Sequence, residues 1–358
     1  MPNITRKYAA VVAGLAAQLA LASFLAFPAA GYSWDPPQKK PFLIKTRVRY
    51  WWAASSAKTR AYVLTPPTLW TPPTDNIAMG RTDDFRRMDT SFPLYSAEIE
   101  PVYGLSAEFE IGDSSFRNGS SAQHSWLNSD NRILYLHDDV VWITPNHQDY
   151  SLATAKLTGS SKQYSANLYM RLYKSRPKHA EEMDEFNHSI DLFVGYSWYE
   201  TKTSLTNGYQ ALSTGFFVPT PPTGPFGGMN STAKMSWYGW RAGLREQATL
   251  SDKFSAEGKV SFGPGVRFTG EDFWNLRADL MDPGLRQTAH GLLTEFSTTV
   301  SWNVWEQLDL EGGYMVWAYQ ASSGSETAYY IDGTTQDMTL DRVRGVRKGF
   351  FLALSWKY

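Results

Sequence analysis

Apolar and polar side chains alternate at two-residue spacing along most of the chain. In Ile44–Tyr50 the polar face carries three cations, in Leu105–Ile111 it carries acids, and Phe350–Tyr358 alternates up to the last residue. This period is that of β-strands with one apolar and one polar face. No stretch of comparable length has a helical period, so the pattern predicts an all-β chain.

Ten strands follow from this alternation, and their connections differ in length at the two ends. The predicted strands cover residues 42–53, 94–103, 104–115, 162–174, 188–202, 233–248, 253–269, 290–304, 308–321 and 343–358. Connections after the second, sixth and eighth strands are short, whereas those after the first, third, fifth, seventh and ninth are long. Short periplasmic turns opposite long extracellular loops are typical of antiparallel transmembrane β-barrels. The connection over residues 175–187 is long for a periplasmic turn, so twelve strands stay open as an alternative.

The N-terminal segment has the features of a secretory signal peptide. Arg6 and Lys7 precede an apolar stretch from Ala9 to Phe27, and small residues suited to cleavage follow it. The alternative is that this stretch is a transmembrane anchor, whereas no later apolar run reaches the ~18 residues that a spanning helix needs. We expect residues 1–31 to be a signal peptide and residues 32–358 to form one barrel domain in the Gram-negative outer membrane.

Aromatic side chains gather near the ends of the predicted strands. A soluble β-sandwich would also alternate, but it would not need Trp and Tyr there, whereas membrane barrels carry aromatic girdles at both interfaces. The residues concerned are Tyr50, Trp52, Tyr196, Trp198, Trp237, Tyr238, Trp240, Trp302, Trp305, Trp317 and Tyr319. The chain also ends in an aromatic residue. Leu354, Trp356 and Tyr358 resemble the insertion signal of bacterial outer-membrane proteins, which implies the outer-membrane assembly machinery as a partner.

The polar face of the predicted strands is charged, and opposite charges fall on strands that are neighbours in sequence. The charged positions are Lys45, Arg47, Arg49, Glu98, Glu100, Glu108, Glu110, Arg241, Arg245, Glu257, Glu295 and Glu311. A ten-stranded barrel has a narrow lumen, in which unpaired charges would be costly. We therefore expect an interlocked salt-bridge network that fills the lumen, with Arg47 opposite Glu98 or Glu100. A narrow channel stays an alternative if the charges leave a path for water.

Composition excludes several classes of function. The 34 basic residues become 32 once Arg6 and Lys7 of the leader are removed, against 35 acidic residues, so a polybasic nucleic-acid binder is excluded. The chain has no Cys, which excludes disulfides, thiol catalysis and thiolate metal sites. Its six His residues are scattered, and no serine-nucleophile motif, HExxH motif or phosphate-binding loop is present. We predict neither a metal nor a cofactor.

Proline-rich segments lie in the predicted extracellular loops. Thr-Pro-Pro-Thr occurs at residues 65–68, 71–74 and 220–223. Pro-Pro fixes polyproline geometry, so these loops should be stiff rather than floppy. They either form a recognition surface or simply resist proteases, and we favour the second interpretation.

One dense group of candidate catalytic residues lies in the second long loop. His137 is followed directly by Asp138 and Asp139. A His beside two carboxylates can hold and activate a water as a general base. The same three residues also suit a solvated acidic turn, which is the interpretation that their spacing favours.

Several segments resemble the omptins, ten-stranded outer-membrane proteases whose active site lies in the loops above the barrel. The similar segments are residues 96–106, 136–142 and 235–269, together with Asp282-Pro283-Gly284-Leu285-Arg286. Together they extend over most of the chain after the leader, and Asp-Pro-Gly is their most specific part. The resemblance implies an omptin-like barrel with outer-membrane lipid as a partner. It points to lipopolysaccharide in particular, because omptins need that lipid for activity.

The chain departs from the omptin pattern at the residues that carry catalysis. Omptins have an Asp-x-Asp pair in the second long loop and an Asp-x-His pair shortly before the Asp-Pro-Gly segment. Here the second loop has adjacent Asp138 and Asp139 after His137. The positions of the other pair fall on Ala278 and Leu280, neither of which can orient a water.

The resemblance and the residues therefore disagree about catalysis. Proteolysis carries over only if Asp272, Asp279 or His290 replaces the missing pair, and Asp279 should point to the other face of an extended segment. We expect a non-catalytic surface protein with a structural or recognition role and a packed lumen. The alternatives are an omptin-like endopeptidase and a narrow channel. The sequence names no extracellular ligand.

Overall fold

The computed structural model describes residues 43–65, 77–129, 133–137, 140–144, 147–175, 187–214 and 220–358, and antiparallel strands make up most of them. The strands are β1 (Leu43–Thr65), β2 (Ile77–Arg86), β3 (Thr90–Val102), β4 (Leu105–Ser129), β5 (Ile133–His137), β6 (Val140–Thr144), β7 (His147–Lys174), β8 (Asn187–Ser213), β9 (Gly224–Pro225), β10 (Asn230–Thr249), β11 (Phe254–Phe273), β12 (Leu280–Trp305), β13 (Leu308–Tyr330) and β14 (Thr335–Lys357). The described ranges contain no helix with the length and apolar character needed to span a membrane. The predicted signal peptide, residues 1–31, lies outside them.

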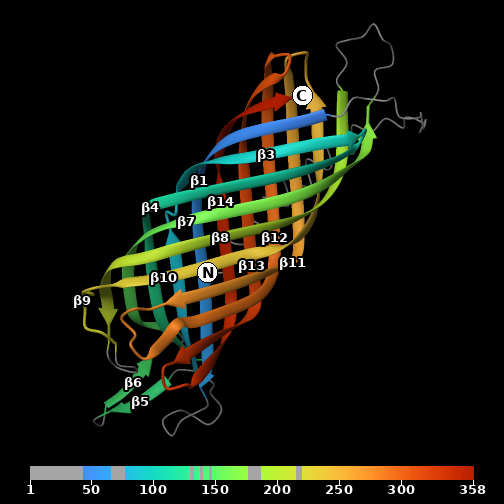
Figure 1. Cartoon of the computed structure of the whole chain (residues 1–358). Helices are drawn as coiled ribbons and strands as arrows, with labels where there is room; N and C mark the ends of the chain where they lie inside the picture. Colours follow the sequence, from blue (N-terminus) through green and yellow to red (C-terminus); the bar gives the residue numbers. More distant parts are fainter. Residues whose placement is uncertain are drawn as a thin grey trace. The chain divides into compact units, whose positions relative to one another are not determined.

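Twelve of the strands form one sheet that closes into a barrel (Figure 1). The first strand, β1, pairs with the last, β14, and β10 pairs with both β8 and β11. Strands β2 and β3 both pair with β1 and β4, so together they occupy one strand position in the wall. Strand β9 has only two residues, which pair with β8. The wall therefore has ten positions, which confirms the predicted barrel of ten strands. Closure matters because it pairs the backbone polar groups that lipid cannot satisfy.

The strands run further than predicted at the loop end. Strand β4 continues to Ser129 and β13 to Tyr330. As a result, the connections after β11 and β13, which were predicted to be long, are turns of residues 274–279 and 331–334. The alternation faded because the outer face of these strand ends is polar as well, so no apolar face marks them in the sequence.

The Asp282–Gly284 segment, expected in a loop, lies inside β12. The register between β12 and β13 slips between Leu280, opposite Tyr330, and Leu285, opposite Ala328. The extra residues form a bulge, which is one of the few places where a sheet tolerates proline.

An apolar belt surrounds the half of the barrel that is nearer the short turns. Its outward side chains are exposed and large, namely Val48, Tyr50, Trp52, Tyr95, Phe109, Ile111, Tyr164, Leu168, Met170, Leu192, Val194, Tyr196, Trp240, Leu244, Phe262, Val300, Trp302, Leu310, Phe350, Leu352, Leu354 and Trp356. About ten tilted residues suffice to cross the hydrocarbon core, whereas these strands have 20 or more. The loop-side halves of the strands therefore project beyond the membrane.

The aromatic residues divide between the belt and the lumen, which corrects part of the prediction. Tyr50, Trp52 and Trp240 face outward and are exposed, as girdle residues would be. Trp237 and Trp317 are instead buried and belong to the core inside the barrel, as does Tyr319. The alternation separates them, because Trp237 has the inward parity of Arg241 on β10 and Trp317 has that of Glu311 on β13. The prediction grouped them by their position near strand ends instead.

Candidate functional site

The lumen at the level of the apolar belt is filled by charged side chains. All twelve residues predicted for this network take part in ion pairs. Glu311 is fully buried and lies 2.9 Å from Lys45 Nζ and 2.7 Å from Arg47 Nε. Each carboxylate is thus matched by a cation that is held by other strands, and we call this set the lumenal network.

The partner of Arg47 differs from the prediction. The register between β1 and β3 places Lys45, not Arg47, opposite Glu98. Arg47 instead contacts Glu311 of β13 and lies 4.0 Å from Glu257 of β11. Strands in a barrel are tilted and surround a narrow space, so a lumenal side chain meets strands other than its neighbours in the sheet.

Two further members of the network were missed. Asp191 is buried and accepts two hydrogen bonds from Arg245, at 3.0 and 2.8 Å from Nε and Nη2. Arg171 Nε donates to the other oxygen of Asp191 at 2.9 Å. Both lie on predicted strands at inward positions, so the alternation that identified their neighbours could have identified them.

Little space is left among these charges. A cavity of about 30 Å³ lies between Arg47, Arg49, Glu108 and Glu257. It is large enough for water but far smaller than the ~300–1,000 Å³ of a ligand pocket. A larger cavity of about 280 Å³ lies nearer the short turns, lined by Lys45, Arg171 and other network residues.

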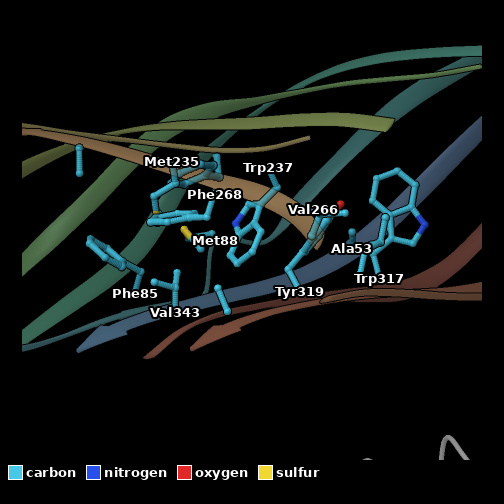
Figure 2. Close-up of a cluster of buried hydrophobic side chains, with 14 of the residues drawn as sticks. Ala53, Phe85, Met88, Met235, Trp237, Val266, Phe268, Trp317, Tyr319 and Val343 are labelled. Carbon is cyan, nitrogen blue, oxygen red and sulfur yellow. The ribbon is translucent and has the colours of Figure 1, made fainter. Parts of the chain in front are cut away.

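Beyond the network, towards the loops, an aromatic layer fills the lumen (Figure 2). It consists of Trp51, Phe92, Trp237, Phe268, Trp317 and Tyr319, all buried. The ring centroids of Trp237 lie 4.8 Å from Phe268 and 5.3 Å from Tyr319, and those of Trp51 and Trp317 are 5.3 Å apart. Tilted rings at these distances pack favourably. The layer closes the lumen a second time.

Arg347 is buried in this aromatic layer. Its guanidinium lies 4.3 Å from the ring centroid of Phe92 and 4.8 Å from that of Trp51. Its Nη2 donates to Thr90 Oγ1 at 2.7 Å and to Ser114 Oγ at 3.3 Å. No carboxylate of the described residues forms an ion pair with Arg347. Its cation–π contacts therefore stabilise the desolvated guanidinium.

A third group of charges, the rim cluster, lies inside the projecting part of the barrel. It comprises Arg81, Asp83, Asp272 and Glu326. Arg81 Nε lies 2.7 Å from Asp83, and its Nη2 lies 3.0 Å from Glu326 and 3.7 Å from Asp272. Asp272 is ten residues beyond Phe262, the last belt residue of β11, so the cluster lies outside the membrane.

Carboxyl groups outnumber cations in the rim cluster, and the pKa values of two of the carboxyl groups are raised as a result of this and of burial. Burial raises the pKa of Asp272 to about 8, and the charges of Asp83 and Glu326 add to the effect despite Arg81. Burial also raises the pKa of Glu326. Burial alone would lower the pKa of Arg81, but the surrounding carboxylates raise it instead. The cluster therefore retains a proton on Asp272 at neutral pH.

Among the described residues, the omptin-like catalytic positions before Asp282 contain no matched pair of acid and base. Asp279 is exposed, and Arg277 donates to both of its oxygens, at 2.8 and 2.7 Å. This hydrogen bonding lowers the pKa of Asp279. Ala278 and Leu280 flank it. In the second loop, Asp138 and Asp139 lie outside the described residues.

The remaining predicted site residues are scattered. His137 is the last residue of β5. His290 is exposed and follows the buried, inward Ala289 on β12, so it faces away from the lumen. The three residues of the expected insertion signal are also exposed, at 53% for Leu354, 36% for Trp356 and 67% for Tyr358, and their role in assembly stays a prediction. The described residues contain no group of three His, Asp or Glu side chains suited to a metal ion.

The described barrel matches a solved outer-membrane enzyme in architecture. It superposes on the outer membrane protease OmpT from Escherichia coli with a TM-score of 0.65, over 90% of this chain and 99% of that chain, at 10% sequence identity. The chain has the omptin barrel fold. At this identity the similarity concerns fold alone.

Sequence comparison adds a match to an outer-membrane protein family. The Pom family profile, described as Protochlamydia outer membrane protein, matches residues 184–346. No curated protein sequence matches the chain. Its fold and this match make the chain a β-barrel of the Gram-negative outer membrane, as predicted.

Two transporters are similar at a much lower level. A FadL homologue from Pseudomonas aeruginosa has a TM-score of 0.25 at 9% identity, over 88% of this chain and 90% of that chain. The toluene transporter TbuX from Ralstonia pickettii has a TM-score of 0.25 at 8% identity, over 87% and 89%. Such scores carry no argument about this chain.

Proposed function

We propose that this outer-membrane barrel is a non-catalytic surface protein with a structural or recognition role. The observation that carries the proposal is the loop after β11. Where omptins place an Asp-x-His pair, this chain has Ala278 and Leu280, and Asp279 between them is paired with exposed Arg277. General-base hydrolysis needs a group that can hold the attacking water and a second group that orients it. Neither flanking side chain can do so.

The filled lumen supports the same proposal against the channel alternative. The lumenal network and the aromatic layer lie one above the other. The cavity in the middle of the network has a volume of about 30 Å³, and the larger cavity of about 280 Å³ lies on its short-turn side. A solute path would have to cross both. The surface loops are then the part of the molecule that is available to partners outside the cell.

One observation favours the endopeptidase alternative. The pKa of Asp272 is raised to about 8, which is close to the working pH that suits a general base. Asp272 is nevertheless buried beside Arg81 and two other carboxyl groups, 8% exposed as a whole residue. A substrate would reach it only after the rim cluster had opened.

Digestion of a peptide library by the refolded full chain, with lipopolysaccharide present, tests the proposal. We expect no cleavage, including of dibasic peptides, because general-base assistance alone is worth ~10²–10⁴-fold in rate. Asp138→Ala and Asp139→Ala should then have no phenotype. Cleavage that is abolished by Asp139→Ala would contradict the proposal and the register anchored on Asp282–Gly284. Cleavage that is abolished only by Asp272→Asn would establish the endopeptidase alternative.

A further inference from the structure

The larger cavity, on the short-turn side of the lumenal network, has a lining in which cations predominate. Its volume of about 280 Å³ is just below the ~300–1,000 Å³ of pockets that hold drug-sized ligands, so it suits a smaller molecule. Six lysine or arginine side chains line it, against four glutamate or aspartate side chains. We call this space the short-turn cavity. Its cations are Lys45, Arg47, Arg171, Lys174, Arg245 and Lys357.

Two further carboxylates balance these cations from behind the lining. Asp191 forms ion pairs with Arg171 and Arg245, and Glu311 forms one with Lys45. Asp191 and Glu311 are only 1% and 0% exposed, and neither lines the short-turn cavity. A molecule inside the cavity therefore meets more cations than carboxylates, although the network as a whole is matched.

The four carboxylates of the lining already accept hydrogen bonds from neutral groups of the protein. Each has one such donor, at a distance of 2.7 to 3.0 Å. A cationic ligand would have to compete with these donors. The donor and acceptor residues are Ser106 with Glu98, the backbone N–H of Gly104 with Glu100, Gln247 with Glu257, and Asn303 with Asp309.

The lysines of the lining, in contrast, keep donors that face the cavity. Within the described ranges, Lys45 and Lys357 each have one carboxylate contact, at 2.9 Å and 2.7 Å, and Lys174 has none. The Lys174 ammonium instead lies 5.5 Å from the ring centroid of Tyr103. An ammonium group carries three N–H donors, so each of these lysines can donate further hydrogen bonds. Spare donors and occupied acceptors together favour an anionic ligand.

These cations lie on two separate parts of the wall. Lys45 and Lys357 are directly opposite one another on β1 and β14, whereas Arg171 and Lys174 lie on β7. Strands β3 and β4 separate β1 from β7 at this end of the barrel. Like charges directly opposite one another destabilise a sheet, so an anion beside Lys45 and Lys357 would relieve their repulsion.

We propose that the short-turn cavity binds a small molecule of the periplasm that carries two anionic groups, either phosphates or carboxylates. One group contacts Lys45 and Lys357, and the other contacts Arg171 and Lys174. The molecule enters from the periplasm, because the middle of the network and the aromatic layer close the way to the loops. A molecule with a single anionic group reaches only one of the two cationic parts.

Isothermal titration calorimetry of the refolded full chain in detergent micelles tests the proposal, at about 0.15 M sodium chloride to screen exposed charges. The probes are pyrophosphate and succinate, and inorganic phosphate and acetate are their counterparts with a single group. We expect pyrophosphate or succinate to bind saturably, at least about tenfold more tightly than its counterpart, because the second group adds charge-assisted hydrogen bonds. The probe that binds identifies the anionic group. Saturable binding of neither probe would overturn the proposal, as would equal affinity for a probe and its counterpart.

A pair of variants locates the binding. Lys174→Gln with Lys357→Gln removes one cation from each part of the cavity and should weaken binding by about tenfold or more. The matched control, Lys162→Gln with Lys202→Gln, removes two exposed lysines from the outer face of β7 and β8 and should leave the affinity unchanged. Unchanged affinity in the cavity variant, or an equal loss in the control, would overturn the proposal. The comparison of probes on the unchanged chain does not need a folded variant, and it is independent of the peptide digestion that tests the proposed function.

Discussion

The lumenal network and the rim cluster are both groups of buried charges inside one barrel, and they differ in balance. In the network, cations and carboxylates are matched across strands, as Arg245 is with Asp191 and Glu98. In the rim cluster, three carboxyl groups surround Arg81 alone. The first arrangement binds the strands together at the level of the lipid. The second leaves excess negative charge, so its stability depends on a proton.

The difference follows from where each group lies. At the level of the belt, water is far away on both sides of the wall, and an unmatched charge would be costly there. The rim cluster lies in the projecting part, near the loops, where protonation can relieve an imbalance. The network is therefore expected to respond to mutation and the rim cluster to pH.

The largest expected effect comes from reversing Arg47 in the network. Arg47→Glu removes the cation from Glu311 and adds a third carboxylate beside it and Glu257. We expect a loss of at least ~3–5 kcal/mol in the free energy of unfolding, the usual cost of stranding a buried charge. Urea unfolding in detergent micelles measures it. In the Arg47→Glu background, adding Glu311→Arg should restore part of the loss, whereas adding Glu98→Arg should not. The opposite result would show that Arg47 pairs with Glu98, as the sequence predicted.

A smaller effect, dependent on pH, is expected from Asp272→Asn. The folded-state pKa of Asp272 is raised to about 8, so the folded chain binds a proton that the unfolded chain releases above the ordinary pKa of Asp. Stability should therefore fall as the pH rises from about 4 towards 8, at up to ~1.4 kcal/mol per pH unit from this group. Asp272→Asn should remove that component of the slope. Parallel stability–pH curves for the two proteins would mean that the rim cluster is already balanced.

The smallest effect is expected for the ion pair between Asp279 and Arg277, which is exposed to solvent. The side chains of Asp279 and Arg277 are 51% and 53% exposed, and Asp279→Asn breaks their contact. Exposed ion pairs contribute little, so we expect a change below ~1 kcal/mol in unfolding and no change in peptide digestion. A loss comparable to that of Arg47→Glu would show that burial is not what separates these pairs.

The sequence predicted the barrel well because alternation is a local property. Stretches such as 44–50 and 350–358 carry the belt on one face and charges on the other, so both the strands and the lumenal charges could be read from them. The ion-pair partner of each lumenal charge could not be predicted in the same way. Whether Arg47 meets Glu98 or Glu311 depends on register and tilt, which the alternation leaves open.

The parts that the sequence did not predict correctly have polar outer faces, or were assigned by their position near strand ends rather than by the face of the strand. The loop-side ends of β11 and β13 looked like loops, because no apolar face marks a strand outside lipid. Trp237 and Trp317 looked like girdle residues, although they fill the lumen. The rim cluster joins β2, β11 and β13, which are distant in sequence, and a separate acid on each gives no local signal. Only the closed ring brings them together.

Conductance across a planar lipid bilayer tests the central claim, that two layers of side chains close this lumen, most directly. Refolded full chain should insert without producing stable current steps, because the cavity in the middle of the lumenal network is only about 30 Å³ and the aromatic layer lies above it, so the larger cavity near the short turns has no open path to the loops. Heat-modifiable gel mobility of the same sample confirms that the barrel is folded. Reproducible ohmic steps from folded, wild-type protein would contradict the closed lumen and support the channel alternative.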